Sequence, residues 1–324
     1  TTSVIDSAVF TNAAGCDSTA ILNLTINQAD TSYTNITACD SAVWNGTTYT
    51  QSGTYSYSSS SLFSQLGQDI DGEAPNDYSG VAVSLNYNGN IVAIGAKNNS
   101  NGTGHVRVYE NINGSWIQLG QDIDGESSGD HSGVSVSLSS NGYTLAIGAT
   151  ENDGNGTDAG HVRIYEYINS AWIQLGQDID GEYSPDESGK SVSLSSNGNI
   201  VAIGAWWNDA NGDDAGHVRI YEYTNSSWIQ LGQDIDGENI YDRSGISISL
   251  SSNGYTLAIG ATENDGNGAD AGHVRVYNWS GTSWIKIGQD IDGEAPGDYS
   301  GRSVSLSSDG NTVAVGAHGN DGAG

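Results

Sequence analysis

From residue 63 onward, apolar and polar residues alternate in short runs that turn-forming residues interrupt. The stretch from Ser132 to Ile179 shows the pattern, with Ser139-Ser-Asn-Gly142 and a Gly-, Asp- and Asn-rich segment between its runs. Alternation with a period of two, bounded by turn residues, is typical of half-buried β-strands. The runs predict four antiparallel strands, at 134–138, 144–149, 161–167 and 172–179. No window shows the 3.6-residue period of a helix, so we expect helices to be essentially absent.

The four expected strands recur along the chain at a fixed spacing. The fourth strand and the residues after it read WIQLGQDIDGE at Trp116–Glu126, and the glycine that opens GQDIDGE returns at residues 67, 120, 176, 232 and 288. The repeat is therefore 53 residues long once and 56 residues long three times. Four antiparallel strands in a repeat of this length are typical of a β-propeller blade. A β-solenoid is the competing architecture, but its coils are usually shorter and parallel.

We therefore expect an all-β protein with two parts. Residues 63–324 hold four full repeats and a partial fifth, and residues 1–62 form a small β-sandwich-like segment with strands near Ala20–Ile26 and Thr47–Thr50. The chain contains no Met and stops at Gly324 in the middle of a repeat, so we expect it to be part of a longer polypeptide. The blade number stays open, because one more third strand would complete five blades and further repeats would complete seven.

Two short motifs recur in each blade: Ser-Gly before the first strand and Gly-Ala at the end of the second. One pair is Ser132-Gly133 and Gly148-Ala149, in SGVSVSLSSNGYTLAIGA followed by GHVRIYEY. This pattern resembles the FG-GAP repeats of integrin-α-type propellers in their divergent bacterial form, which implies a β-propeller over 63–324. The calcium loop of that family joins the first two strands, where this chain has only Ser139-Ser-Asn-Gly142. The family's calcium site is therefore not carried over.

The N-terminal segment contains two Cys-Asp-Ser motifs. GCDSTAILNLTIN at Gly15–Asn27 and TACDSAVWNGTTYTQSGTYSY at Thr37–Tyr57 resemble the Cys-Asp-Ser repeats of very large secreted bacterial surface proteins. The resemblance implies a spacer without chemistry on an extracellular, cell-surface protein. Cys16 and Cys39 are the only cysteines, and an even count in a Ser/Thr-rich segment favours a disulfide over two unrelated thiols.

The charge of the chain is strongly negative, with 39 Asp and Glu against 9 Lys and Arg and a net charge of −30. Such a surface repels phosphate groups, so we expect no nucleic-acid partner and no binding to anionic membranes. No apolar run approaches the roughly 18 residues that a membrane-spanning helix needs. Divalent cations and basic ligands fit this charge better.

The acidic residues are concentrated in two loops of each blade. In a four-strand meander, the inter-blade loop and the loop between strands two and three (the strand 2–3 loop) lie at the same end of the sheet, so most acids gather on one face. In the inter-blade loop, Asp122, Asp124, Glu126 and Asp130 offer oxygen ligands at relative positions 1, 3, 5 and 9, as Ca²⁺ sites do. Alternatively, Asp and Gly only build turns, and the surplus charge keeps a secreted protein in solution.

The candidate Ca²⁺ ligands are equivalent residues of successive repeats. Those of the inter-blade loops are Asp69, Asp71, Glu73, Asp77, Asp122, Asp124, Glu126, Asp130, Asp178, Asp180, Glu182, Asp186, Asp234, Asp236, Glu238, Asp242, Asp290, Asp292, Glu294 and Asp298. Those of the strand 2–3 loops are Asp153, Asn155, Asp158, Asp209, Asn211, Asp214, Asp265, Asn267 and Asp270.

Other conspicuous residues repeat once per blade. The four histidines before Val-Arg, represented by His161, are interpreted as structural, because they cannot meet in one metal site without sharing the central axis. The arginine two residues later is expected to pair with a carboxylate between blades. Trp172 and its equivalents are expected to pack between adjacent blades. Trp206-Trp207 breaks the repeat and is a candidate for stacking on a sugar, although an exposed loop aromatic often has no role.

Three functional hypotheses follow. The first is a non-catalytic extracellular module for adhesion or display, stabilised by Ca²⁺ and binding a cell-surface glycan or protein. The second is a glycan-binding propeller or the accessory domain of a polysaccharide-degrading enzyme, and the third is a structural spacer. We expect no enzyme activity, because near-identical blades lack the residue differences between blades that an active site requires.

Overall fold

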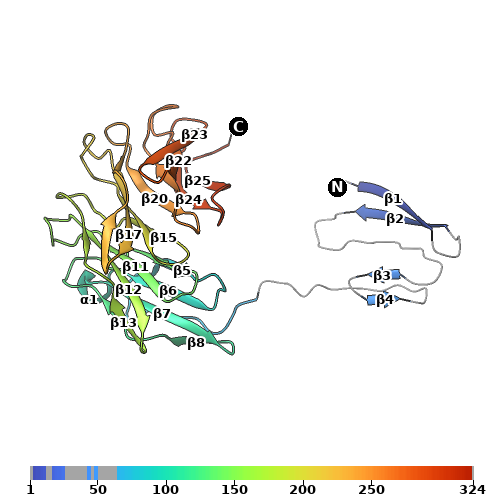
Figure 1. Cartoon of the computed structure of the whole chain (residues 1–324), viewed down its shortest axis with the longest axis horizontal. Coiled ribbons are helices and arrows are strands. Elements are labelled where there is room, and N and C mark those ends of the chain that lie inside the picture. The colour runs from blue at the N-terminus through green and yellow to red at the C-terminus, as the bar shows by residue number, and fades with distance from the viewer. Residues whose placement is uncertain (1–2, 12–16, 26–41, 45–46, 50–63, 323–324) are drawn as a thin grey trace. The chain divides into compact units, whose positions relative to one another are not determined.

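The computed structural model describes residues 3–11, 17–25, 42–44, 47–49 and 64–322 (Figure 1). The chain divides into two compact units, Thr1–Ser64 and Gln65–Gly324. Among the described residues α1 (Asn99–Gly102) is the single helix. No helix in this part of the chain is long and apolar enough to cross a membrane. The prediction of an all-β chain is confirmed.

The first unit contains two antiparallel hairpins. β1 (Ser3–Thr11) pairs with β2 (Asp17–Thr25), and β3 (Ala42–Trp44) pairs with β4 (Thr47–Tyr49). β2 and β4 lie where alternation predicted strands. Cys16 and Cys39 lie outside the described residues, so their disulfide stays a prediction, as does the sandwich-like arrangement of this segment.

The second unit contains five successive sheets, each an antiparallel meander. First strands are β5 (Ser79–Leu85), β10 (Ser135–Leu138), β15 (Ser191–Leu194), β20 (Ser244–Leu250) and β24 (Ser300–Leu306). Second strands are β6 (Ile91–Ala96), β11 (Thr144–Ala149), β16 (Ile200–Ala205), β21 (Thr256–Ala261) and β25 (Val313–Ala317). Third strands are β7 (His105–Ile112), β12 (His161–Ile168), β17 (His217–Thr224) and β22 (His273–Trp279). Fourth strands are β8 (Ser115–Gln118), β13 (Ala171–Gln174), β18 (Ser227–Gln230) and β23 (Trp284–Asp292).

The fourth strand is interrupted where the sequence indicated one continuous strand, at 172–179. After a left-handed glycine (Gly120, φ 82°), the chain rejoins the third strand, so that Asp124 pairs with His105. These continuations are β9 (Ile123–Asp124), β14 (Ile179–Asp180) and β19 (Ile235–Asp236), whereas β23 runs unbroken. Ile-Asp of DIDGE is therefore strand, and only Gly-Glu and the residues after it form the inter-blade loop.

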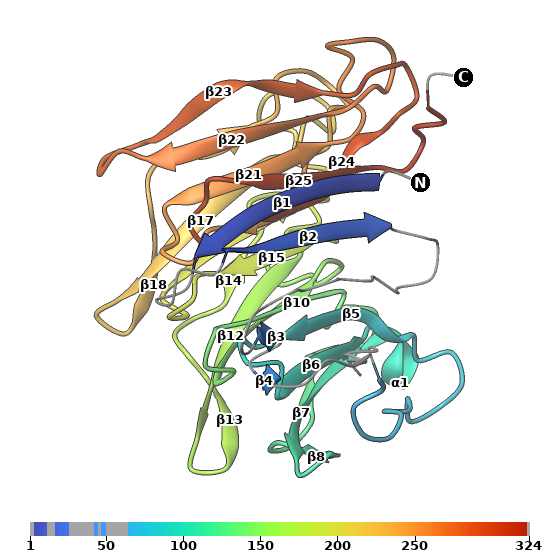
Figure 2. The same cartoon turned by 90° about the vertical axis from the view of Figure 1, so that its right-hand side faces the viewer.

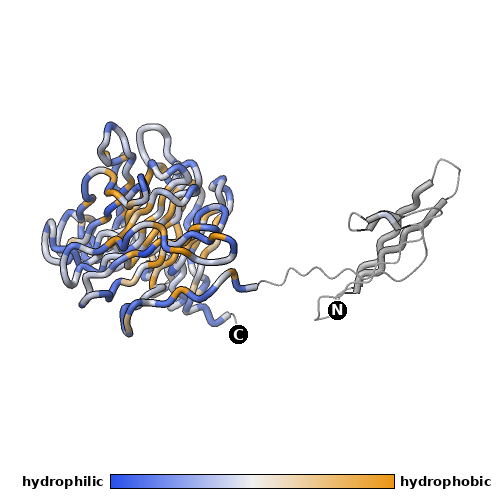
Figure 3. Tube along the Cα trace, turned by 90° about the horizontal axis from the view of Figure 1, so that it is seen from below, coloured by the Kyte–Doolittle hydropathy of each residue, from blue (hydrophilic) through white to orange (hydrophobic). Residues whose placement is uncertain are grey.

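The first strands of successive sheets contact one another, while β8, β13, β18 and β23 lie at the periphery (Figure 2). Apolar side chains from the facing sheets fill the space between blades: Val106 and Val108 of one sheet pack with Leu145 and Ile147 of the next. The hydrophobic stretches accordingly run through the interior of this unit (Figure 3). This arrangement of four-stranded antiparallel sheets is that of a β-propeller.

The Ser-Gly and Gly-Ala motifs meet between blades. A Cβ atom added at Gly148 would lie 2.1 Å from the carbonyl oxygen of Gly189 in the following blade. Gly189 itself has a φ of 91°, a conformation that favours glycine. The same approach joins Gly95 to Gly133, Gly204 to Gly245 and Gly260 to Gly301. Both motifs are therefore explained by close packing of backbone on backbone.

The tryptophan of the fourth strand links each blade to the preceding one. Trp172 is 2 % exposed, and its indole Nε1–H donates to the carbonyl of Leu119 at 2.7 Å. The side chain of Gln121 also bonds both backbone groups of Trp172. The other three tryptophans make the same bond at 2.7–2.8 Å, to Leu66, Leu175 and Leu231. The prediction that these residues pack between blades is confirmed.

The first sheet has one uncovered apolar face. Leu85 is 60 % exposed, although its equivalent Leu138 is 8 % exposed because the preceding blade covers it. Within the described residues no sheet covers Leu85, so the structure shows a succession of blades and not a closed ring.

Substituting Gly148 by Ala tests the close packing. The new Cβ would meet backbone of the next blade at 2.1 Å, so we expect G148A to lower the free energy of unfolding by about 1–3 kcal/mol, measured by denaturant titration. Gly316 is the matched control, because its added Cβ would meet only the Ser303 side chain and carbonyl of its own sheet. An equal loss in G316A would contradict the explanation.

Candidate metal centres at the blade interfaces

A cluster of one Glu, one His and one Asp recurs at the junctions between blades. In Glu126, His161 and Asp178, one ligand atom of each side chain lies within 4.8 Å of the others. We call this group the interface cluster. The other three are Glu73–His105–Asp122, Glu182–His217–Asp234 and Glu238–His273–Asp290.

The fold positions each member of the interface cluster through backbone geometry. His161 is the first residue of β12 and pairs with Asp180 of β14, which places it beside Asp178. Glu126 follows the fourth strand of the preceding blade. Gly125 allows this strand end to lie close to the backbone of Thr103, because a Cβ at Gly125 would lie 2.1 Å from the carbonyl oxygen of Thr103. The cluster therefore forms only when two successive repeats are packed together.

The histidine side chain of each interface cluster is buried. His217 is 1 % exposed, and neither of its ring nitrogens has a hydrogen-bond partner. Burial, together with the charge of Arg219, lowers the pKa of His217 to about 3. Burial also lowers the pKa of His161 and His273. A neutral imidazole keeps the nitrogen lone pair that a metal ion requires.

An arginine lies beside each interface cluster. The Arg163 guanidinium donates to the carbonyl of Asp124 at 2.8 Å and is 3.4 Å from the Glu126 carboxylate. Arg219 repeats these contacts with Asp180 and Glu182. The prediction that these arginines pair with carboxylates between blades is confirmed. Glu126, Glu182 and Glu238 each have one oxygen next to a cation and the other available, whereas the second oxygen of Glu73 accepts the Asn99 amide at 3.2 Å.

The cluster chemistry suits borderline divalent metals. One imidazole nitrogen and two carboxylate oxygens are a donor set that Zn²⁺ and similar first-row ions accept. Ca²⁺ takes oxygen ligands, usually six to eight. The clusters can therefore hold a metal, and their nitrogen donor favours a transition metal over the predicted Ca²⁺.

The structure places the predicted Ca²⁺ ligands in three different roles. Eight of them, from Glu73 and Asp122 to Glu238 and Asp290, are the carboxylates of the interface clusters. Asp130 is 4 % exposed and accepts the N–H of Ser127 at 2.9 Å and the amide of Asn152 at 3.1 Å. Its equivalents Asp77, Asp186, Asp242 and Asp298 likewise accept backbone N–H groups of their own turns.

The strand 2–3 loops are closed by their own polar residues. Asp153 accepts the N–H of Asp158 at 3.0 Å, and the Asn155 amide donates to Gly181 in the next inter-blade loop at 2.8 Å. The later repeats use Asp209, Asp214 and Asn211, and Asp265, Asp270 and Asn267, in the same way. Ca²⁺ binding by the acids outside the clusters stays a prediction. Among the described residues, the carboxylates of a single inter-blade loop do not form a three-ligand group.

Neighbouring side chains contact the Trp206-Trp207 pair. The two rings stack with centroids 5.2 Å apart, and the Trp206 indole donates to Glu187 at 2.7 Å. Lys190 lies 4.1 Å and Arg243 5.1 Å from the Trp206 ring centroid. Both tryptophans are half-buried. Sugar stacking on this pair stays a prediction.

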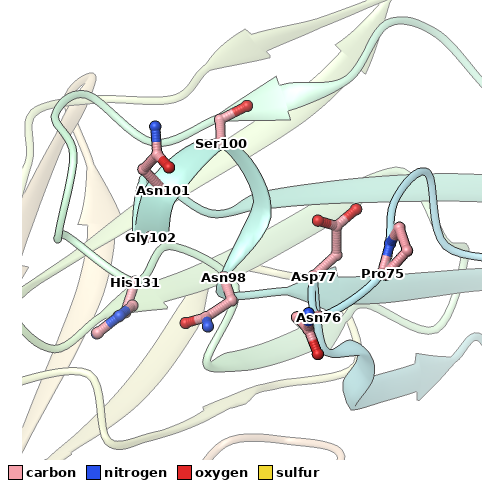
Figure 4. A pocket seen from close by; sticks show the side chains of 8 residues that line it. All are labelled: Pro75, Asn76, Asp77, Asn98, Ser100, Asn101, Gly102 and His131. Carbon is pink, nitrogen blue, oxygen red and sulfur yellow. The ribbon is translucent and has the colours of Figure 1, made fainter.

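A shallow pocket of about 520 Å³ opens beside the first blade, where the strand 2–3 loop is three residues shorter than elsewhere (Figure 4). Its lining includes Asp77, Asn98, Asn101 and His131. None of these residues belongs to an interface cluster.

Sequence reasoning missed the histidines. The signal was present, because His precedes Val-Arg in all four complete repeats at the spacing of the acids. It was dismissed because four histidines were expected to need one common axis. The structure instead gives each His carboxylates from two consecutive repeats.

Known proteins resemble the chain only distantly. No family model and no curated protein sequence matches the chain. Solved structures that resemble it include hydrazine synthase of Kuenenia stuttgartiensis, at 12% identity and a TM-score of 0.48, over 74% of this chain and 61% of that one. Another is the periplasmic gluconolactonase of Pseudomonas aeruginosa, at 16% identity and a TM-score of 0.49, over 72% of this chain and 64% of that one. A protein of Bacteroides uniformis assigned provisionally as a 6-phosphogluconolactonase has 13% identity and a TM-score of 0.48, over 97% and 71%.

These neighbours correct one expectation. The chain was expected not to be an enzyme because its blades are nearly identical, yet all three neighbours are named as enzymes. That expectation was therefore wrong. The chain spans less than two thirds of the first two neighbours, and at these identities the likeness concerns the fold alone. No reaction or substrate is transferred from them.

The depressed pKa of His217 predicts an acid-sensitive stability. The ordinary pKa of His is 6.5, and that of His217 in the folded chain is about 3. Between these two pH values the unfolded chain binds a proton at His217 that the folded chain does not bind. This contribution is fully present above pH 6.5 and is lost as the pH falls toward 3, at about 1.4 kcal/mol per pH unit. Urea unfolding at several pH values, with a chelator present, should show a shallower dependence for H217Q than for the native chain. Equal slopes would contradict the buried neutral imidazole.

Proposed function

We propose that the protein is a β-propeller whose interface clusters bind divalent cations and that it acts outside the cell in adhesion or display. The observation that carries the proposal is the recurrence of the same His and two carboxylates at four junctions between blades. A single cluster of this kind arises by chance. Four equivalent ones, each assembled from two repeats, indicate a role that every junction shares.

Electrostatics supports cation binding. The chain has a net charge of −30, and burial raises the pKa of Glu182, which shows that this carboxylate is partly desolvated. The charge of Asp234 also raises the pKa of Glu182, so the two carboxylates repel each other. A divalent ion between them would offset this repulsion and join two blades. Because binding requires the packed junction, the ion would stabilise the folded state over the unfolded one.

The extracellular setting rests on composition and on the N-terminal segment. The acidic surface, the Ser- and Thr-rich first 62 residues and their resemblance to Cys-Asp-Ser repeats suit a secreted or surface-anchored protein. The expected partner is a glycan or protein of a cell surface. Nucleic acid is disfavoured by the charge.

Zn²⁺ titration of chelator-treated protein tests the clusters. We expect binding of up to four ions per chain and a rise in the melting temperature. E126Q removes an exposed carboxylate of one cluster and should lower the stoichiometry by one, whereas H131Q, outside the clusters, should leave it unchanged. The proposal is contradicted if Zn²⁺ does not bind, or if E126Q leaves the stoichiometry of binding unchanged. Binding of Ca²⁺ without Zn²⁺ would instead favour the acids outside the clusters.

Adhesion or display is tested separately on arrays of cell-surface glycans and proteins, with and without chelator. We expect binding that persists at high salt and weakens when the metal is removed. A chain that binds Zn²⁺ but no array component would point to a structural spacer stabilised by metal.

A further inference from the structure

Three positions next to the Ser-Gly and Gly-Ala motifs differ from blade to blade, although the repeats are nearly identical. They are the residue before Ser-Gly, the residue after Ser-Gly and the residue after Gly-Ala. The first position holds Tyr78, His131, Glu187, Arg243 and Tyr299; the second Val81, Val134, Lys190, Ile246 and Arg302; the third Lys97, Thr150, Trp206, Thr262 and His318. We call these fifteen residues the variable rim.

The variable rim lies at one end of the inner strands. Its positions precede or begin the first strand and follow the second strand of each blade, and the first strands of successive sheets contact one another. All five residues of the first position have left-handed φ values of 49–56°. Non-glycine residues adopt this conformation at a cost of roughly 1 kcal/mol or more, and it persists where the surrounding structure imposes it.

Rim residues contact different partners in each blade. His131 is 2.8 Å from Glu151, Glu187 accepts from Trp206 at 2.7 Å, and Arg243 is 2.7 Å from Glu263. In the fifth sheet Tyr299 stacks on His318 with ring centroids 5.1 Å apart. The scaffold therefore repeats while the chemistry at this end changes from blade to blade, which is what a binding site for an asymmetric ligand requires.

The rim contains every basic residue that does not belong to the third or fourth strands. Of the nine Lys and Arg, four are the strand-three arginines and one is Lys286 of β23; the remaining four are Lys97, Lys190, Arg243 and Arg302. The strand-three arginines, Lys286 and Arg243 each have a carboxylate within 4.0 Å. In the part of the chain that the structure describes, Lys97, Lys190 and Arg302 have none.

Three cations without a carboxylate are unexpected in a chain with 39 acids. Burial lowers the pKa of Lys190, the neighbouring Glu187 carboxylate raises it, and the charges of Arg302, Lys97 and Arg243 lower it. Lys97 and Arg302 belong to blades two repeats before and two repeats after Lys190. Lys190 and Arg243 both lie over the Trp206 ring, 4.1 and 5.1 Å from its centroid, so these positive charges repel one another. An anion placed among them would relieve this repulsion.

We propose that the variable rim is a binding site for an anionic ligand that carries a carboxylate, sulfate or phosphate group. Lys97, Lys190 and Arg302 supply the unpaired positive charge. Trp206 holds Lys190 and Arg243 over its ring and thereby fixes the position of both cations. The acidic loops around the rim exclude multiply charged polyanions such as nucleic acids and admit smaller ligands.

Calorimetric titration with three probes tests the site: inorganic sulfate, inorganic phosphate and galacturonate. At least one should bind, and the binding probe identifies the anion class. K190Q and R302Q should each weaken binding about tenfold, the loss expected for one charge-assisted hydrogen bond. K286Q removes the same single charge at a distant, paired position and should not change the affinity.

The proposal is overturned if none of the three probes binds. It is also overturned if K286Q weakens binding as much as K190Q and R302Q do, since the effect would then reflect net charge alone. Circular dichroism of each variant shows whether the fold is intact. If K190Q unfolds, R302Q decides the matter, because Arg302 is exposed and its replacement disturbs no packed side chain.

Discussion

The structure depends on the close approach of backbone to backbone between blades. Gly148 and Gly189 touch at a separation that no side chain would permit, and the same contact recurs at four junctions. Because these glycines set the distance between sheets, they also determine which other side chains meet. The tryptophan of the fourth strand reaches the preceding blade, and a glutamate at one strand end reaches a histidine of the next.

Much of the fold could be predicted because the relevant information is local. Alternation located the strands, and the fixed period showed that they build equivalent sheets. Trp172 and Arg163 were correctly placed between blades from residue type alone. The interruption of the fourth strand was missed: the predicted strand 172–179 breaks after Gln174, where Gly176 takes a left-handed φ of 79°, and resumes at Ile179.

The candidate metal site was only half predictable, because it depends on packing between repeats. Periodicity identifies which residues recur but not which of them meet across a junction. Asp130 has the residue type of a ligand, yet its carboxylate is used by its own turn. His161 lies near Asp178 of its own repeat and gains its second carboxylate, Glu126, only from the blade before. A residue's neighbours in sequence were therefore a poor guide to its neighbours in space.

The uniform junctions also have a genetic consequence. Since each blade presents the same glycines, tryptophan and cluster residues to the next, adjacent repeats can be duplicated or deleted by unequal recombination without creating a mismatched interface. A change in blade number would then leave every junction with the same contacts. The uncovered face of the first sheet, with Leu85 exposed, is the kind of end at which such an array can be extended.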